Sequence, residues 1–276
     1  MRQSVEARRH RSSRPPVLAT VDGQWINIAE QSQIISQVRL DFHLEHGFSI
    51  HVLNLDHLVK RRSDPIYKDA YERATYVTCD GAPVAALARR QFTGMRRTPG
   101  PDLIEPLCRL AAQERMPVYL FGSSGEALRR AATQLSLRCP GLDICGTDAP
   151  PKNFDPTSPA ADAAMDRMAA SGARLCLIAL GSPKQEVFSR RALDRHPHLG
   201  FLNIGAGMDF IGGARLRAPK VAKENGLEWL WRLATNPRRL SGRYARCAVL
   251  LADVAIAHPL RRKLGLPGSN LGNSGR

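Results

Sequence analysis

From residue 47 onward, short apolar runs alternate with longer stretches in which apolar residues recur at helical spacing. The runs are rich in Val, Ile, Leu and aromatic residues, and most of them close on Gly, Asp or Asn, which is typical of buried β-strands. They are GFSIHVLNL, ATYVTCD, PVYLFGS, LDICG, RLCLIALG and GFLNIGAG. The stretches between them predict helices at about residues 56–72, 82–92, 101–115, 125–138, 159–171 and 184–195.

This alternation predicts the fold class. Strands that alternate with helices indicate an α/β fold. We expect a mainly parallel sheet with Rossmann-like elements and with helices packed on its faces. In sheets of this kind, ligands bind beyond the carboxyl ends of the strands. Candidate functional residues should therefore follow directly after the apolar runs.

The two ends of the chain differ from this central pattern. We expect residues 1–16 to form a disordered basic arm and residues 17–215 to form the α/β core, which opens with a short strand and a helix. Residues 216–258 predict a basic helical appendage, because the pattern after Gly213 changes to helices with basic residues and two Trp. The polar, Gly-rich residues 259–276 predict a disordered tail.

The predicted appendage is strongly basic. Pro237 at a first helical position, with Asn236 as N-cap, separates a helix ending near Ala234 from another ending near Ala257. Most of the formal net charge of +15 comes from this segment and from the basic arm. Such concentration predicts contact with an anionic surface, either nucleic acid or acidic lipid, although a solvated basic face would give the same pattern.

Several classes of protein are disfavoured. The longest apolar stretch, Ala248 to Ala257, contains Asp253 and falls short of the roughly 18 residues that a membrane-spanning helix needs. The basic N-terminus precedes no apolar segment, so we expect no secretory signal. The six cysteines form no C-x-x-C pair, which indicates a reducing cytoplasm and no zinc site.

Three turns that follow predicted strands carry candidate chemistry. Asp80, in TCDGAP, could take a proton from a hydroxyl or could simply cap the next helix. The GSPKQE turn, residues 181–186, suits a phosphate because it presents backbone N–H groups at a helix start, and Lys184 and Gln185 could add donors. An ordinary strand-to-helix turn is the alternative. The Gly-rich IGAGMDFIGG turn lacks the third glycine of a dinucleotide fingerprint.

A series of arginines lies in the predicted appendage. Arg238 and Arg239 fall in the first turn of a predicted helix, where the macrodipole disfavours each cation by a few tenths to about 1 kcal/mol. An anion could compensate, because guanidinium groups grip diphosphates through paired hydrogen bonds, and a solvated face is the alternative. Trp229 and Trp231 suit a membrane interface or ordinary packing.

Seven blocks, taken in order, resemble the motifs of the WecG/TagA/CpsF family of bacterial glycosyltransferases. They are LNLDHL (53–58), CDGAPV (79–84), RTPGPDL (97–103), FGSSGE (121–126), ALGSPKQE (179–186), IGAGMDFIGGARLRAP (204–219) and GLEWLWRLATNPRRLSGRY (226–244). The resemblance covers about residues 47–246. The GSPKQE and EWLWRL…PRR blocks are together specific enough to make chance agreement very improbable.

The resemblance implies an enzyme of cell-surface or exopolysaccharide biosynthesis. Family members move a sugar from a nucleotide sugar, typically UDP-linked, to a sugar on a polyprenyl diphosphate lipid. The resemblance therefore implies an inverting, metal-independent hexosyltransferase without a cofactor. The chain contains no D-x-D triplet, which removes the usual aspartate pair that holds a metal on a sugar nucleotide. Implied partners are the UDP-sugar donor, the lipid-linked acceptor and the anionic inner face of the cell membrane, with peripheral cytoplasmic attachment. The C-terminal helices could also support a homo-oligomer.

The resemblance also implies roles for particular residues. The family's proposed general base falls on Asp80, its asparagine near the sugar site on Asn54, and its arginine before the G-x-D-L block on Arg97. The P-K-Q-E block supplies Gln185 beside Lys184. The arginines implied to contact the lipid diphosphate or the leaving group are Arg232, Arg238, Arg239 and Arg243. In one departure, Val52 stands where many members have Thr, which removes a hydroxyl near the sugars.

Two other classes stay as alternatives. A pI near 10.3 favours a nucleic-acid-binding protein, but such proteins place aromatic residues to stack on bases, and here aromatic residues make up only 6% of the chain and the basic residues are terminal. A nucleotide-dependent oxidoreductase lacks its glycine fingerprint. We therefore expect a transferase that has no nucleic-acid partner.

Overall fold

The computed structural model describes residues 14–213, 228–235 and 237–257, without the side chains of Glu228, Arg232, Arg239 and Ala257. The predictions for most of the basic arm, for the tail and for the Asn236 cap lie outside the described residues.

Six strands form one sheet in which every neighbouring pair is parallel. They are β3 (Phe48–Leu53), β4 (Tyr76–Cys79), β5 (Val118–Gly122), β6 (Ile144–Asp148), β7 (Leu175–Ala179) and β8 (Gly200–Asn203), in the order β4-β3-β8-β7-β5-β6. The predicted α/β fold is confirmed. Five strands lie within the predicted apolar runs, and only β6 extends beyond its run.

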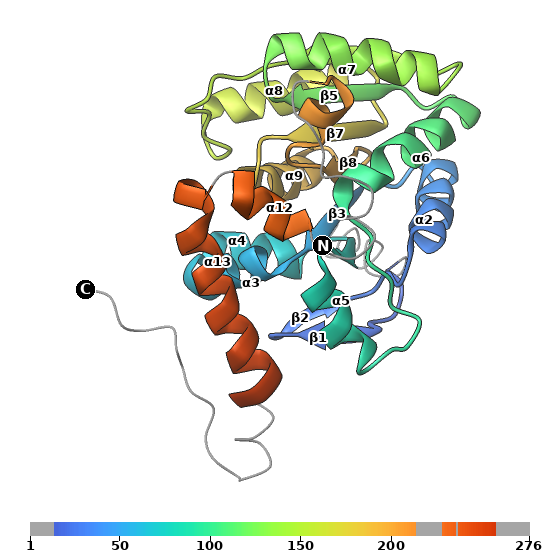
Figure 1. The fold of residues 1–276 in the computed structure, drawn as a ribbon. Coiled ribbons are helices and arrows are strands. Elements are labelled where there is room, and N and C mark those ends of the chain that lie inside the picture. The colour runs from blue at the N-terminus through green and yellow to red at the C-terminus, as the bar shows by residue number, and fades with distance from the viewer. Residues whose placement is uncertain (1–13, 214–227, 236, 258–276) are drawn as a thin grey trace.

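Helices cover both faces of the sheet (Figure 1). On one face pack α2 (Gln31–His43), α6 (Gly100–Gln113), α7 (Gly125–Arg138) and α10 (Gly207–Ile211), and on the other pack α8 (Pro159–Ala170) and α9 (Lys184–Arg195). Successive strand residues supply the two cores: Leu120 belongs to the first and Phe121 to the second. Every residue of β3, β4, β5, β7 and β8 is buried, which explains why these strands read as continuous apolar runs, whereas β6 lies at the edge of the sheet and is only partly buried.

The predicted helix over residues 56–72 is wrong in one respect, because the chain forms two helices there. These are α3 (Leu55–Ser63) and α4 (Pro65–Glu72). Asp64 leaves the helical conformation, and its side chain accepts a hydrogen bond from the backbone N of Tyr67 at 3.0 Å. A residue before proline is disfavoured in helical geometry, and Pro65 is well suited to a first helical position. The break lets α4 change direction and bury Tyr67 and Tyr71.

A short hairpin lies beside β4 and forms a separate two-stranded sheet. Its strands are β1 (Ala19–Val21) and β2 (Gln24–Ile26). The two residues between them, Asp22 and Gly23, have φ values of 51° and 72°, and Asp-Gly is a favoured pair for a turn of this kind. The hairpin packs with α3, α4 and α5 (Ala82–Arg89) in a third apolar cluster.

Within the described residues after Gly213, two α-helices follow the α/β layers along the chain. They are α12 (Glu228–Thr235) and α13 (Pro237–Ala252), and a π-helical turn over Asp253–Ala257 continues α13. The start at Pro237 and the helical geometry up to Ala257 are as predicted. Helix α13 lies against α3 (Figure 1), and Leu250 is buried in the third apolar cluster. None of the helices in the described ranges combines the length and hydropathy required to cross a bilayer.

Candidate active site

Asp80 follows β4 directly, at the carboxyl edge of the sheet. Its backbone N donates to the carbonyl of Leu53 at 2.7 Å, which ties the ends of β3 and β4 together. The N-cap residue of α5 is Gly81, with a φ of +89°, and no side chain caps this helix. A positive φ of this size favours glycine. Asp80 is half-buried and is not the cap, so the capping interpretation that the sequence also allowed does not hold.

A cavity of about 290 Å³ opens beside this carboxylate. Its polar edge contains four of the residues predicted from the sequence: Asn54, Asp80, Arg97 and Arg243. Leu55 and Asp56 of α3 and the backbone turn at Gly81 also line the cavity. The rest of its lining is largely apolar and comes from α5, the 99–101 segment, α12 and α13. Those residues are Ala82, Pro83, Pro99, Pro101, Trp229, Tyr244, Cys247, Ala248 and Leu251. The cavity therefore combines a charged edge with an apolar wall, and the C-terminal helices supply much of that wall.

Asn54 connects helix α3 to Asp80. It is the N-cap of α3, and its Oδ1 accepts a hydrogen bond from the backbone N of His57 at 3.1 Å. Its Nδ2 donates to Asp80 Oδ2 at 3.4 Å and lies 3.3 Å from His57 Nε2. Capping with Asn is favourable because it satisfies a backbone N–H that the helix leaves without a partner. One amide thus both begins a helix and holds the candidate base.

His57 lies behind this pair in the interior. Its Nδ1 is 2.8 Å from the carbonyl of Val52 and 2.7 Å from the hydroxyl of Tyr71. Burial, followed by the charge of Lys60, lowers the pKa of His57 to about 3, so the imidazole is neutral at physiological pH. His57 lies in the LNLDHL block, but the sequence pattern gave it no role.

Arg97 reaches the cavity because its segment runs alongside the end of β4. Cys79 and Arg97 form an isolated parallel bridge, and the backbone N of Thr98 donates to the carbonyl of Cys79 at 2.7 Å. The hydroxyl of Thr78 donates to the carbonyl of Thr98 at 3.0 Å. This pairing brings Arg97 to the same cavity as Asp80, although the two are separated by a helix and a loop in sequence.

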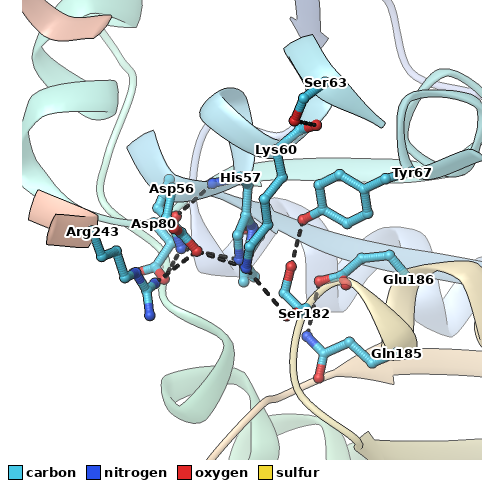
Figure 2. A network of polar contacts seen from close by, with 12 residues as sticks. Asp56, His57, Lys60, Ser63, Tyr67, Asp80, Ser182, Gln185, Glu186 and Arg243 are labelled. Atoms are coloured by element: carbon cyan, nitrogen blue, oxygen red, sulfur yellow. Dashed lines mark hydrogen bonds and ion pairs between the residues drawn. The ribbon is translucent and has the colours of Figure 1, made fainter. Parts of the chain in front are cut away.

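Asp56, Lys60 and Arg243 form a cluster of charges, drawn in Figure 2, and two of its members, Asp56 and Arg243, line the cavity. Asp56 Oδ2 forms ion pairs with Lys60 Nζ at 2.7 Å and with Arg243 Nη2 at 3.0 Å. Burial by itself raises the pKa of Asp56, but the hydrogen bond from Lys60 and the charges of Arg243 and Lys60 outweigh burial and hold that pKa below its usual value. One carboxylate between two cations leaves the cluster with a net positive charge, which suits an anionic group. Sequence analysis did not identify Asp56 or Lys60.

The GSPKQE turn joins the same cluster. Lys60 Nζ donates to the carbonyl of Ser182 at 3.1 Å, and the hydroxyl of Tyr67 lies 2.7 Å from Ser182 Oγ. Both contacts are visible in Figure 2, where Lys60 lies between the Asp56 carboxylate and the Ser182 turn. Helix α3 therefore connects the carboxyl end of β3 to that of β7.

Within this turn, the two predicted donors lie in different surroundings. Lys184 is half-buried, and its Nζ donates to the carbonyl of Lys152 at 3.2 Å. Gln185 is only 3% exposed: its Oε1 accepts from the backbone N of Gly205 at 3.0 Å, and its Nε2 donates to Glu186 Oε1 at 2.9 Å. Gln185 thus braces the turn after β8 against the start of α9. Its predicted contact with substrate stays a prediction.

Glu186 is a fully buried carboxyl that sequence analysis did not assign. Burial raises its pKa to about 7, although the hydrogen bond from Gln185 acts in the opposite direction. The side chain lies next to Gln185 and close to Ser182 (Figure 2). A carboxyl in this position is partly protonated at neutral pH.

The remaining predicted residues are placed as follows. Arg238 is exposed near the start of α13. The side chains of Arg232 and Arg239 lie outside the described residues. Val52 is 6% exposed and contributes its carbonyl to His57, so this position supports the site through its backbone.

No group of three or more His, Cys, Asp or Glu side chains with metal-site geometry occurs within the described ranges. The metal-independent reaction stays a prediction. With carboxylate, amide and guanidinium groups at its edge, the cavity has the means to accept a proton from a hydroxyl and to neutralise a departing anion.

The comparison with known families agrees with this geometry. The model of the glycosyl transferase WecG/TagA/CpsF family matches residues 20–264, which include the whole sheet, Asp80 and the described parts of the C-terminal helices. A match over nearly the whole chain establishes membership. The chain therefore belongs to the WecG/TagA/CpsF family of glycosyltransferases.

Proposed function

We propose that this glycosyltransferase moves a hexose from a UDP-sugar to a sugar carried on a polyprenyl diphosphate, with inversion and without a metal ion, in the synthesis of a cell-surface or exopolysaccharide polymer. The observation that carries the proposal is the cavity beside Asp80, which joins a charged edge to an apolar wall. A lipid-linked sugar diphosphate has the same division, with a polar reacting end and an apolar tail.

In the proposed reaction, the Asp80 carboxylate takes the proton from the acceptor hydroxyl. The hydroxyl oxygen forms a bond to the anomeric carbon on the face opposite the nucleotide. The bond from that carbon to the diphosphate oxygen breaks, and UDP leaves with the electron pair. A positioned general base of this kind contributes roughly 100- to 10,000-fold to the rate.

Cationic groups would take over the role of a metal at the diphosphates. Arg97 and Arg243 line the cavity near Asp80, and Lys184 lies in the turn after β7. Fixed cations and helix N-termini stabilise a developing phosphate charge without rearranging during the reaction. We assign the donor diphosphate to the 181–186 turn and the acceptor diphosphate to the arginines of α13.

The apolar wall and the basic C-terminal segment suggest where the enzyme works. Each Lys or Arg close to an anionic bilayer contributes about 1 kcal/mol of attraction, so the segment could hold the enzyme at the inner face of the cell membrane. In that position the mouth of the cavity would receive an acceptor whose tail stays in lipid.

The test is a transferase assay with a panel of UDP-sugars and a short-chain polyprenyl-diphosphate sugar, in EDTA, with products identified by mass. Asp80→Asn should keep the fold and the affinity for nucleotide but lower turnover by roughly 100-fold or more. Asp143→Asn is the matched control, because Asp143 is exposed before β6, away from the carboxyl ends. No product with any UDP-sugar, or unchanged turnover in Asp80→Asn, would contradict the proposal.

A further inference from the structure

The orientation of the Asn54 amide is determined by its neighbours. Its oxygen must face the backbone N–H of His57, because that group can only donate. Its nitrogen therefore faces Asp80 Oδ2 and His57 Nε2. The two N–H bonds of the amide suffice for these two acceptors, provided that Nε2 carries a lone pair and not a proton.

The surroundings of His57 select that form of the ring. The carbonyl of Val52 can only accept, so the Nδ1 atom 2.8 Å away must carry the proton. The hydroxyl of Tyr71 is also directed to this carbonyl, at 3.1 Å. A neutral imidazole protonated on Nδ1 has an unprotonated Nε2, which is the acceptor that the Asn54 amide requires.

The groups around His57 keep the ring neutral. His57 is 5% exposed, and its ring extends from α3 into contact with the rings of Tyr67 and Tyr71 on α4. The charged groups that act on it are Lys60 and Arg243, which oppose a second proton, and Asp56, which favours one. A second proton would place an N–H against the N–H of Asn54 and break the arrangement.

We infer that His57 is a positioning residue, whose unprotonated Nε2 holds the Asn54 amide so that this amide orients the carboxylate of Asp80. The chain of contacts runs from the carbonyl of Val52 through the imidazole and the amide to the carboxylate, and each donor meets an acceptor. The inference deepens the proposed function and rests on it in taking Asp80 as the base. Misplacement of a reacting group by about 1 Å can lower a rate by roughly 100-fold, so a second residue that holds the base is expected to affect turnover.

The first test needs no activity. With ¹⁵N-labelled histidine, nitrogen–proton correlation spectra separate the two neutral tautomers and the charged ring. The chain has eight histidines, and the signal lost in His57→Phe identifies the one of interest. We expect the Nδ1–H tautomer and no titration between pH 5 and 8. An Nε2–H tautomer, or a charged ring at pH 7, would overturn the inference whether or not the transferase is active.

The second test measures turnover and KM in three variants that fold. His57→Phe keeps the backbone N–H that Asn54 caps but removes the ring acceptor, so kcat should fall by roughly 10- to 100-fold while both KM values change less than about threefold. His57→Gln offers an amide oxygen near the position of Nε2 and should recover part of the loss. The matched control is His51→Phe: His51 is equally buried, and neither of its ring nitrogens has a hydrogen-bond partner among the described residues.

The outcomes separate the two proposals. Active wild-type enzyme with unchanged kcat in His57→Phe, or an equal loss in His51→Phe, would overturn the role of His57 and leave the proposed function intact. Wild-type enzyme that transfers no sugar would refute the proposed function, and the tautomer measurement would still decide the arrangement around Asn54. A cooperative thermal unfolding transition in each variant shows that lost activity does not come from lost structure.

Discussion

Asp56 in α3 and Arg243 in α13 form an ion pair, with 3.0 Å between Oδ2 and Nη2. These residues are far apart in sequence, and their pairing brings the C-terminal helices to the edge of the cavity beside Asp80. Lys60 shares the same carboxylate. The position of α13 over the site therefore depends partly on the ion pair between Asp56 and Arg243, while Lys60 shares that carboxylate from within α3.

The first prediction concerns this contact. Arg243→Ala should increase hydrogen–deuterium exchange along α13 several-fold, because a partly exposed ion pair contributes about 0.2–1 kcal/mol and the variant removes the one of Asp56's two cationic partners that lies on α13. Arg246→Ala is the control, since Arg246 is exposed on the same helix. Equal exchange in the two variants would show that the ion pair does not hold α13.

The second prediction concerns Glu186 and how the stability of the fold changes from acidic to slightly alkaline pH. Because burial raises its pKa from 4.5 to about 7, the folded state holds a proton that the unfolded chain has already lost. The free energy of unfolding should therefore decrease as pH rises from about 4.5 to 7. Above pH 7 the decrease is complete, on the order of 3 kcal/mol, because the carboxyl is then ionised in the folded state as well. Glu186→Gln removes this group, so its stability relative to wild type should rise between pH 5 and pH 8.

Urea unfolding at those two pH values provides the measurement. Comparing each variant with wild type at the same pH cancels the effect of the overall positive charge. Glu45→Gln serves as control, because Glu45 is exposed. If Glu186→Gln and Glu45→Gln follow the same pH dependence, the buried carboxyl is ionised in the folded state without cost.

The third prediction concerns His51 and acid stability. Burial, followed by the nearby His57 and Arg190, lowers the pKa of His51 from 6.5 to about 3. Below pH 6.5 the His51 side chain binds a proton in the unfolded chain but stays neutral in the folded state. The free energy of unfolding therefore decreases as pH falls from 6.5 towards 3. His51→Phe should lose less stability than wild type between pH 7 and 5, by about 1–2 kcal/mol. His43→Phe, at an exposed position, should lose as much as wild type.

The fourth prediction concerns attachment to lipid. Leu230 and Trp231 of α12 are 47% and 40% exposed. Leu230→Ser should reduce flotation with anionic vesicles by several-fold if this helix enters the interface, because burial of a leucine side chain contributes about 1.5–3 kcal/mol. Leu137→Ser removes the same side chain from an exposed position on α7, on another part of the fold, and should float as wild type does. Equal flotation of all three proteins would argue against contact through α12.

The secondary structure could be predicted from the sequence because its signals are local. Apolar runs marked the six strands, and Pro237 marked the start of α13. The predicted helix over residues 56–72 is wrong because its apolar spacing continues through Asp64, whereas the cap and the proline interrupt the backbone there. The Asp64-Pro65 capping pattern was a better signal here than the apolar spacing, because a cap determines where the backbone hydrogen bonds of a helix begin.

The candidate site was predictable only in part. Asp80 was identified from its place after a predicted strand as well as from a family motif. Asn54, Arg97 and Arg243 were identified from family motifs, and the cavity brings all four residues together. For Gln185 the motif gave the residue but not its surroundings: its amide is engaged by Gly205 and Glu186 in the interior. His57 lies in the LNLDHL block but was given no role, because its function depends on the contacts of its ring with Val52 and Asn54, which the sequence does not show.

The sequence by itself determined the α/β alternation, the basic C-terminal segment and the family, because each is recorded in the order and spacing of residues. Only the tertiary structure decided that Gly81 is the cap and Asp80 is not, that His57 is neutral, and that Arg243 meets Asp56. Burial and pairing set these properties. Both depend on which distant segments the parallel sheet brings to the same edge, and spacing along the chain does not specify that.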